Sequence, residues 1–128
     1  MSLPLKFTAA LAGTIATTAA VSVGAVAAEV FHKLSDAQIR SKFIGKQFTD
    51  EVHWGELYEA NGKLTSDEMG RKRVGTWTIQ SDRLCTDFGM EGRRNCYEVW
   101  MSGRKVELRV AGSTGDPVEG VLETPKRR

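Results

Sequence analysis

Turn-forming residues recur at short and steady intervals between positions 45 and 112, and no long helical pattern separates them. The signals are Gly45, Asn61-Gly62, Met69-Gly70, Ser81-Asp82, Gly89 to Gly92 and Gly103-Arg104. Parallel strands need a crossover of a dozen or more residues, whereas antiparallel strands can be joined by a tight turn. The spacing therefore predicts a mainly β domain: an antiparallel meander of about six strands, as a curled sheet or a small barrel.

Between these turns the hydrophobic residues follow the two-residue period of a strand. Phe48, Val52, Trp54 and Tyr58 occupy even positions, which indicates one half-buried strand or two strands with a break near Asp50. Further strands are expected at 63–67, 74–80, 83–88, 95–102 and 105–110. The aromatic residues expected in the core are Trp54, Tyr58, Trp77 and Tyr97.

One short helix is expected before the strands. Ser35 and Gln38 have the spacing of a capping box, in which each side chain accepts a hydrogen bond from the other residue's backbone amide. Leu34 and Ile39 can pack together as a hydrophobic staple, and the glycine at position 45 is a typical helix stop. The sequence predicts a helix over about 36–44.

The first 28 residues have the features of a secretory signal peptide. Lys6 is their only charge, positions 7–28 contain no charged residue or proline, and small residues precede the polar Glu29. We expect cleavage after Ala28 or after Ala27, then a single β-rich domain over 29–111 and a flexible tail over 112–128. The alternative is a membrane anchor, since about 20 apolar residues can span a bilayer. A composition rich in Ala and Thr rather than Leu and Ile favours cleavage.

Charge and location limit the partners. The chain has 18 basic and 16 acidic residues, so removal of Lys6 leaves a domain close to neutral. No nucleic acid and no anionic membrane is expected as a partner. Basic residues at 71–73, 93–94 and 104–105 are interpreted as solvated turns. We expect a periplasmic or secreted protein without stable membrane insertion, whose partner is a protein or a small-molecule ligand in the periplasm.

Cys85 and Cys96 are the chain's two cysteines, and a cysteine pair in an exported domain indicates a disulfide. If the two face each other across a hairpin, Arg83 lies opposite Glu98, and Asp87 lies opposite Arg94. Leu84 and Tyr97 then meet on the other face. The pairing gives a charged outer face and an apolar inner face, so the sequence predicts both the bond and the strand register.

His53 lies near Asp50, Glu51 and Glu56, and a histidine beside carboxylates can act as a base or bind a metal. No H-x-H or H-E-x-x-H spacing accompanies it. By strand alternation Glu51 shares the face of His53, whereas Asp50 and Glu56 point to the opposite face unless the glycine at 55 breaks the alternation. We expect a solvated histidine, with His53 and Glu51 kept as candidate binding residues.

Trp100 is the third candidate binding residue. It falls on the outer face of its strand, with Cys96 and Glu98. It packs over the disulfide or beneath the predicted helix, or it is exposed to a partner. Packing by the helix is favoured, because Ile39 and Phe43 of the helix need an apolar surface to cover.

Four segments resemble a family of short exported proteobacterial proteins without an established activity. They are Thr49 to Trp54, Met69 to Gly75 with the following Trp77, Leu84-Cys85, and Cys96 to Trp100. Members are sometimes labelled dihydrodipicolinate reductases, but this chain has neither the glycine fingerprint nor the room for a nucleotide-binding βαβ fold. The resemblance implies export and a β domain, and it transfers no catalytic residue. Size and architecture are similar to periplasmic β-barrel inhibitors and lipocalin-like barrels.

No nucleophile elbow, P-loop or dinucleotide fingerprint is present in the sequence. We therefore expect no cofactor, no metal and no catalytic residue. The expected function is a non-catalytic binding or inhibitor-like module. The alternative is a small periplasmic enzyme that uses His53 with its neighbouring carboxylates.

Overall fold

The computed structural model describes residues 2–4, 9–25, 27–89 and 94–126. Within them lie one helix, α1 (Asp36–Phe43), and nine strands. The strands are β1 (His32–Lys33), β2 (Lys46–Thr49), β3 (Trp54–Tyr58), β4 (Lys63–Glu68), β5 (Arg71–Gln80), β6 (Arg83–Asp87), β7 (Arg94–Ser102), β8 (Lys105–Arg109) and β9 (Val118–Glu123). Most of the loop predicted at 89–92, together with Arg93 of one basic turn, lies outside the described residues.

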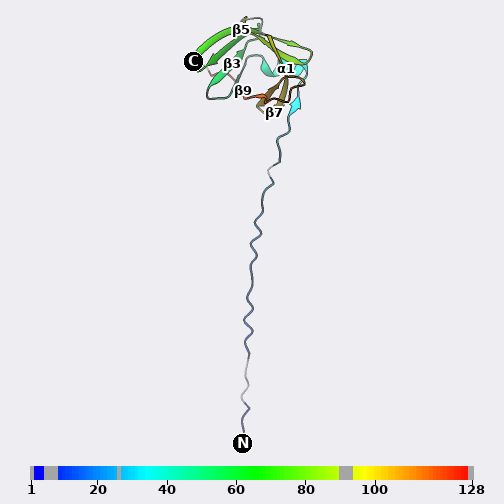
Figure 1. Cartoon of the computed structure of the whole chain (residues 1–128). Helices are drawn as coiled ribbons and strands as arrows, with labels where there is room; N and C mark the ends of the chain where they lie inside the picture. Colours follow the sequence, from blue (N-terminus) through cyan, green and yellow to red (C-terminus); the bar gives the residue numbers. More distant parts are fainter. Residues whose placement is uncertain (1, 5–8, 26, 90–93, 127–128) are drawn as a thin grey trace.

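Eight of these strands form a closed antiparallel barrel (Figure 1). Strands β2 to β8 follow one another as a meander, and β9 pairs with both β2 and β8. A further pairing of β7 with β8 completes the ring. Strand β1 pairs with β7 at Trp100 and Met101, just past Glu98, where the pairing of β7 with β6 ends. The predicted fold class is confirmed, as a small barrel.

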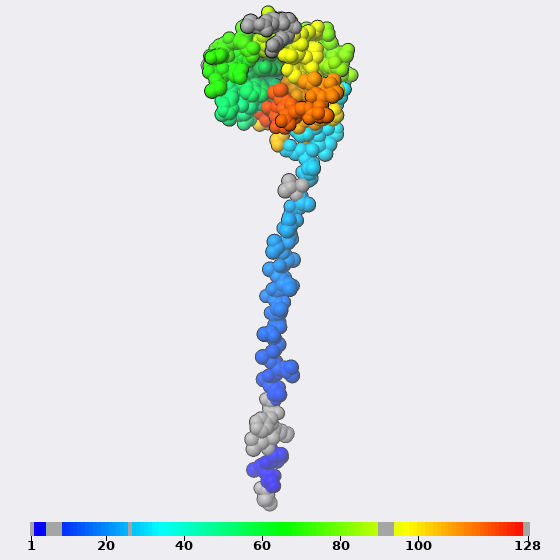
Figure 2. Space-filling view, in the orientation of Figure 1, coloured from blue at the N-terminus to red at the C-terminus, as the bar shows by residue number. Residues whose placement is uncertain are grey.

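The C-terminal segment corrects the sequence prediction of a flexible tail over 112–128. Val118–Glu123 forms β9, which Figure 2 shows in orange and red in the barrel wall. Its apolar residues Val118, Val121 and Leu122 follow a segment rich in Gly, Ser and Asp and precede a basic terminus, and these flanking residues obscured the strand pattern. The free edges of β2 and β8 both need hydrogen-bond partners, and β9 supplies them on each side. Leu122 adds an apolar side chain to the core.

The predicted hairpin register is confirmed. Cys85 and Cys96 are bonded, with their Cα atoms 4.0 Å apart. The residue pairs across β6 and β7 are Arg83 with Glu98, Leu84 with Tyr97, and Asp87 with Arg94. Glu98 also forms an ion pair of 2.9 Å with Lys33, which ties β1 to the same outer face.

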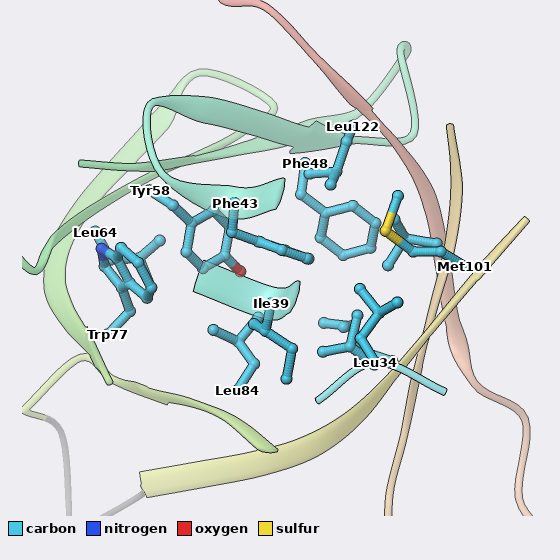
Figure 3. Close-up of a cluster of buried hydrophobic side chains, with 13 residues drawn as sticks. Leu34, Ile39, Phe43, Phe48, Tyr58, Leu64, Trp77, Leu84, Met101 and Leu122 are labelled. Carbon is cyan, nitrogen blue, oxygen red and sulfur yellow. The ribbon is translucent and has the colours of Figure 1, made fainter. Parts of the chain in front are cut away.

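Helix α1 begins as predicted, with both hydrogen bonds of the Ser35–Gln38 capping box present. It ends at Phe43, one residue before the predicted end. Its apolar face is directed into the barrel, where Ile39 and Phe43 have no exposed surface (Figure 3). The prediction that the helix covers Trp100 was therefore wrong. A closed barrel offers a larger apolar surface inside than outside, so the helix covers one end of it.

The described residues before β1 (2–4, 9–25 and 27–31) carry no helix or strand, and most of them extend away from the barrel (Figures 1 and 2). In the described part of the chain, no helix is long and apolar enough to cross a bilayer. The first residues paired with a barrel strand are His32 and Lys33, which lie opposite Met101 and Trp100 of β7.

Candidate functional site

A cavity of about 310 Å³ occupies the barrel at the end away from α1. All eight barrel strands contribute inward-pointing side chains to its lining. These are Phe48, Trp54, Glu56, Ser66, Glu68, Arg73, Thr86, Asn95, Tyr97, Leu108 and Val118, with Phe88 just after β6. An eight-stranded barrel has an interior just wide enough to be filled by side chains or to hold one small ligand. Here α1 fills one end and the other end stays open.

Strand alternation explains how a charged residue reaches this position. On β3 the even-numbered residues point inward, so Glu56 lies between Trp54 and Tyr58 on the interior face. Its cross-strand neighbours are Phe48 on β2 and Ser66 on β4, and Ser66 in turn lies opposite Arg73 on β5. Glu56 thus interrupts an apolar series of inward-pointing residues, so strand alternation alone indicated a polar group on the buried face of β3.

The cavity floor connects Glu56 to the helix. The Tyr58 hydroxyl donates a 2.6 Å hydrogen bond to Oε2 of Glu56, and Tyr58 itself has no exposed surface. The Tyr58 ring packs edge-on against Phe43 of α1 at 5.1 Å and against Trp77 at 5.6 Å between centroids. Figure 3 shows these three aromatic residues gathered beside the helix. The packing of α1 therefore fixes the tyrosine that holds the carboxylate in place.

Aromatic rings form much of the wall. The Trp54 ring packs edge-on against Phe48, with their centroids 4.9 Å apart. The guanidinium carbon of Arg73 lies 4.5 Å from the centroid of the Phe88 ring, which is a cation–π geometry. The half-buried Tyr97 adds a phenol to the lining, close enough for the charge of Glu56 to act on it. The wall thus combines flat apolar surfaces with a few polar atoms, as is typical of small-molecule sites.

Burial raises the pKa of Glu56 above its ordinary value, and the charge of Glu68 adds to the rise. The hydrogen bond from Tyr58 and the positive charge of Arg73 oppose it. Burial also raises the pKa of Tyr97, followed by the negative charge of Glu56. Glu56 is therefore an ionisable group held in a poorly solvated place, with only partial compensation from its neighbours.

The structure places His53 outside this cavity. Residues 50–53 form a turn between β2 and β3, which confirms the predicted break near Asp50. One carboxylate oxygen of Asp50 accepts hydrogen bonds from the amides of Val52, His53 and Trp54. The other lies 2.8 Å from Nδ1 of His53, whose side chain is 62% exposed. The partner of His53 is thus Asp50 rather than Glu51, because strand alternation does not hold within a turn.

Several groups set the electrostatics of this turn. Desolvation raises the pKa of Asp50, but the hydrogen bonds from three amides and the His53 ring outweigh it and hold the pKa well below its usual range. Glu51 has a positive φ of 71° and lies 3.6 Å from the guanidinium of Arg104. Asp50 therefore organises the turn, and its interaction with His53 is on the outside of the barrel.

Trp100 also lies outside the cavity, on the outer face of β7 as its parity predicts. The guanidinium of Arg109 stacks 4.2 Å from its ring centroid, and its indole nitrogen lies 3.5 Å from Glu98. The ring is half-buried beneath these charged side chains. None of the three candidates His53, Glu51 and Trp100 therefore lines the barrel cavity.

A second hollow of about 350 Å³ lies on the outer surface, between residues 29–31, the β2–β3 turn and strands β8 and β9. Its charged groups include Lys105 and Glu29, which form an ion pair with each other. The barrel cavity is the better candidate because fixed strands surround it, whereas Glu29 belongs to the exposed segment before β1. Within the described residues, no three His, Cys, Asp or Glu side chains lie close enough to hold a metal ion.

No family model, curated protein or solved structure matches this chain. The resemblance drawn from its sequence segments stays a prediction. The cavity at the open end of the barrel is the feature from which a function can be inferred.

Proposed function

We propose that this protein is an exported, non-catalytic binding module that takes one small molecule into the cavity of its barrel. The observation that carries the proposal is the cavity of about 310 Å³, lined by every barrel strand and closed on one side by Tyr58 and α1. Ligand pockets are typically about 300 Å³ or larger, and barrel mouths are a common place for them. A water molecule occupies about 30 Å³ of liquid, so the cavity suits a compound of roughly ten heavy atoms.

Export is part of this proposal. The features of residues 1–28 and the Cys85–Cys96 bond support it, because disulfides persist in oxidising compartments. Strand pairing with the barrel begins at His32, so cleavage after Ala27 or Ala28 leaves every described strand intact. Intact mass of protein recovered from the periplasm should give Ala28 or Glu29 as the first residue. Recovery of the full-length chain there would refute export with cleavage.

The cavity itself can be tested by filling it. Ser66 is buried and points into the cavity, so Ser66→Leu should occlude it. Thr65→Leu places the same side chain on the outer face of the same strand and is the matched control. We expect fragments of about ten heavy atoms, detected by ligand-observed NMR, to bind the wild type and Thr65→Leu but not Ser66→Leu. Equal binding to all three proteins would place the fragments elsewhere and contradict the proposal.

A second candidate function rests on the Asp50–His53 pair. A carboxylate 2.8 Å from Nδ1 orients an imidazole as in many hydrolytic sites, and it leaves Nε2 free to act as a base. Hydrolysis of ester or amide substrates that is lost in His53→Ala would support this enzyme. We rank it second, because the pair lies on an exposed turn rather than in a cavity.

A further inference from the structure

We infer that the ligand of the barrel cavity is a protonated amine with a flat apolar body, whose ammonium group binds the free oxygen of Glu56. This inference rests on the proposed small-molecule function and adds the chemical class of the ligand. Its starting point is the unequal use of the two oxygens of the Glu56 carboxylate.

Oxygen Oε2 of Glu56 accepts the hydrogen bond from Tyr58. No described residue donates a hydrogen bond to Oε1. No buried side-chain oxygen or nitrogen among the described residues is left without a partner, so Oε1 must be reached from the cavity. A carboxylate oxygen has room for further donors, and an ammonium group supplies three. Glu56 therefore presents an acceptor to whatever enters the barrel.

The charges around the cavity favour a cation. Its described lining contains two carboxylates, Glu56 and Glu68, and one guanidinium, Arg73. The guanidinium lies over the Phe88 ring. Its positive charge already offsets part of the rise that burial causes in the pKa of Glu56. One carboxylate charge is thus not balanced by a basic group of the described lining. A bound ammonium ion would balance it, whereas an anion would face two carboxylates with a single arginine.

The walls favour a flat apolar body next to that cation. Rings of Trp54, Phe48 and Tyr97 border the cavity, and Leu108 and Val118 complete its apolar side. Aromatic faces attract cations and pack against planar groups. A phenylethylamine has nine heavy atoms. If each occupies roughly the 30 Å³ of a water molecule in the liquid, its volume is similar to that of the cavity.

Three probes that share a phenylethyl group and differ in the charge of the terminal group test the class: 2-phenylethylamine, 2-phenylethanol and 3-phenylpropanoate. Their affinities for the whole exported protein would be measured by calorimetry at neutral pH. We expect the amine to bind at least about tenfold more tightly than the alcohol, because a charge-assisted hydrogen bond is worth about 1.4 kcal/mol or more. The propanoate should bind most weakly. Equal binding of amine and alcohol, or tighter binding of the propanoate, would overturn the ligand class and leave the proposed function intact.

Variants then assign the effect to Glu56. In Glu56→Gln, which can still accept the Tyr58 hydrogen bond, the amine should lose its advantage while the alcohol binds as before. Glu59→Gln is the matched control and should retain the amine preference, because the Glu59 carboxylate lies outside the cavity lining and pairs with Lys63. Loss of the preference in Glu59→Gln, or its retention in Glu56→Gln, would contradict the assignment. If none of the three probes binds the wild type, the proposed function and the ligand class both fail.

Discussion

Glu56 is the residue at which the proposed function and the stability of this protein make opposite demands. It occupies an inward position of β3 where its neighbours Trp54 and Tyr58 are aromatic, and an apolar side chain there would pack without an electrostatic cost. Proteins tolerate such groups at functional sites and offset them elsewhere. We therefore expect the free energy of unfolding to carry a signature of this one carboxyl group.

The stability of the wild type should fall as pH rises through the titration of Glu56. Its pKa is raised in the folded state, chiefly by burial, so the folded protein binds the proton more tightly than the unfolded chain. The protonated Glu56 carboxyl contributes fully to stability below its pKa in the unfolded chain. This contribution is lost as pH rises through its pKa in the folded protein. Glu56→Gln should thus be more stable than the wild type at neutral pH, and the gain should vanish in acid. Denaturant unfolding at a series of pH values measures this, and a variant less stable at neutral pH would contradict it.

His53 should matter little for the fold. Its side chain is mostly exposed, and Asp50 keeps three backbone hydrogen bonds when the ring is removed. We expect His53→Ala to change the free energy of unfolding by no more than about 0.5 kcal/mol and to leave probe binding unchanged. Asp50→Ala is the informative comparison, because it removes the acceptor that holds the turn. A His53→Ala variant as destabilised as Asp50→Ala would show that the imidazole organises the turn.

At the scale of elements, the β6–β7 hairpin illustrates what local sequence can determine. The Cys85–Cys96 pair and two opposite-charge pairs lie within a few residues of one turn, so their spacing gives the register directly. The capping box of α1 is equally local and was equally predictable. The surface that α1 covers was not, because it depends on whether the sheet closes. The same limit explains the Asp50 turn, where a single carboxylate ends the alternation that placed His53 beside Glu51.

Removal of the disulfide should weaken the hairpin without changing the fold. The bond closes a short loop with a sequence separation of 11, and the chain-entropy model assigns roughly 3 kcal/mol to such a loop. The double replacement of Cys85 and Cys96 by Ser should lower the free energy of unfolding by about 2–4 kcal/mol. Wild type unfolded under reducing conditions serves as the control and should behave in the same way. Free thiols in the purified protein would refute the bond itself.

At the scale of the whole molecule, closure of the barrel depends on the least conspicuous strand. Strand β9 lies between β2 and β8, and its Gly120 points inward against Phe48. Closure creates both the interior that α1 fills and the cavity that Glu56 lines. Neither could be predicted from sequence, because they arise from the pairing of positions about 70 residues apart, such as Phe48 with Leu122. The fold class could be predicted from the two-residue hydrophobic period of single strands, whereas the cavity depends on closure of the whole barrel.

Gly120 gives a test of this closure. A Cβ atom at this position would lie 2.5 Å from the Phe48 ring and 2.7 Å from the backbone oxygen of Thr49, so β9 would have to move away from β2. We expect Gly120→Ala to cost about 1–3 kcal/mol, the usual range for overpacking, and to weaken ligand binding. Glu119→Ala, at the exposed neighbouring position, should have little effect on either. Wild-type stability in Gly120→Ala would contradict the tight approach of β9 to β2.

The most direct test of the barrel as a binding module is to locate a bound probe by NMR. The tightest binder of the three phenyl compounds would be titrated into isotope-labelled protein, with the indole N–H signals of Trp54 and Trp100 as reporters inside and outside the barrel. The proposed function predicts saturable shifts of the Trp54 indole and of the amides of Glu56, Ser66 and Thr86, with Trp100 unchanged. Saturable shifts confined to Trp100 or to the turn at 50–53, or no shifts from any probe, would contradict it.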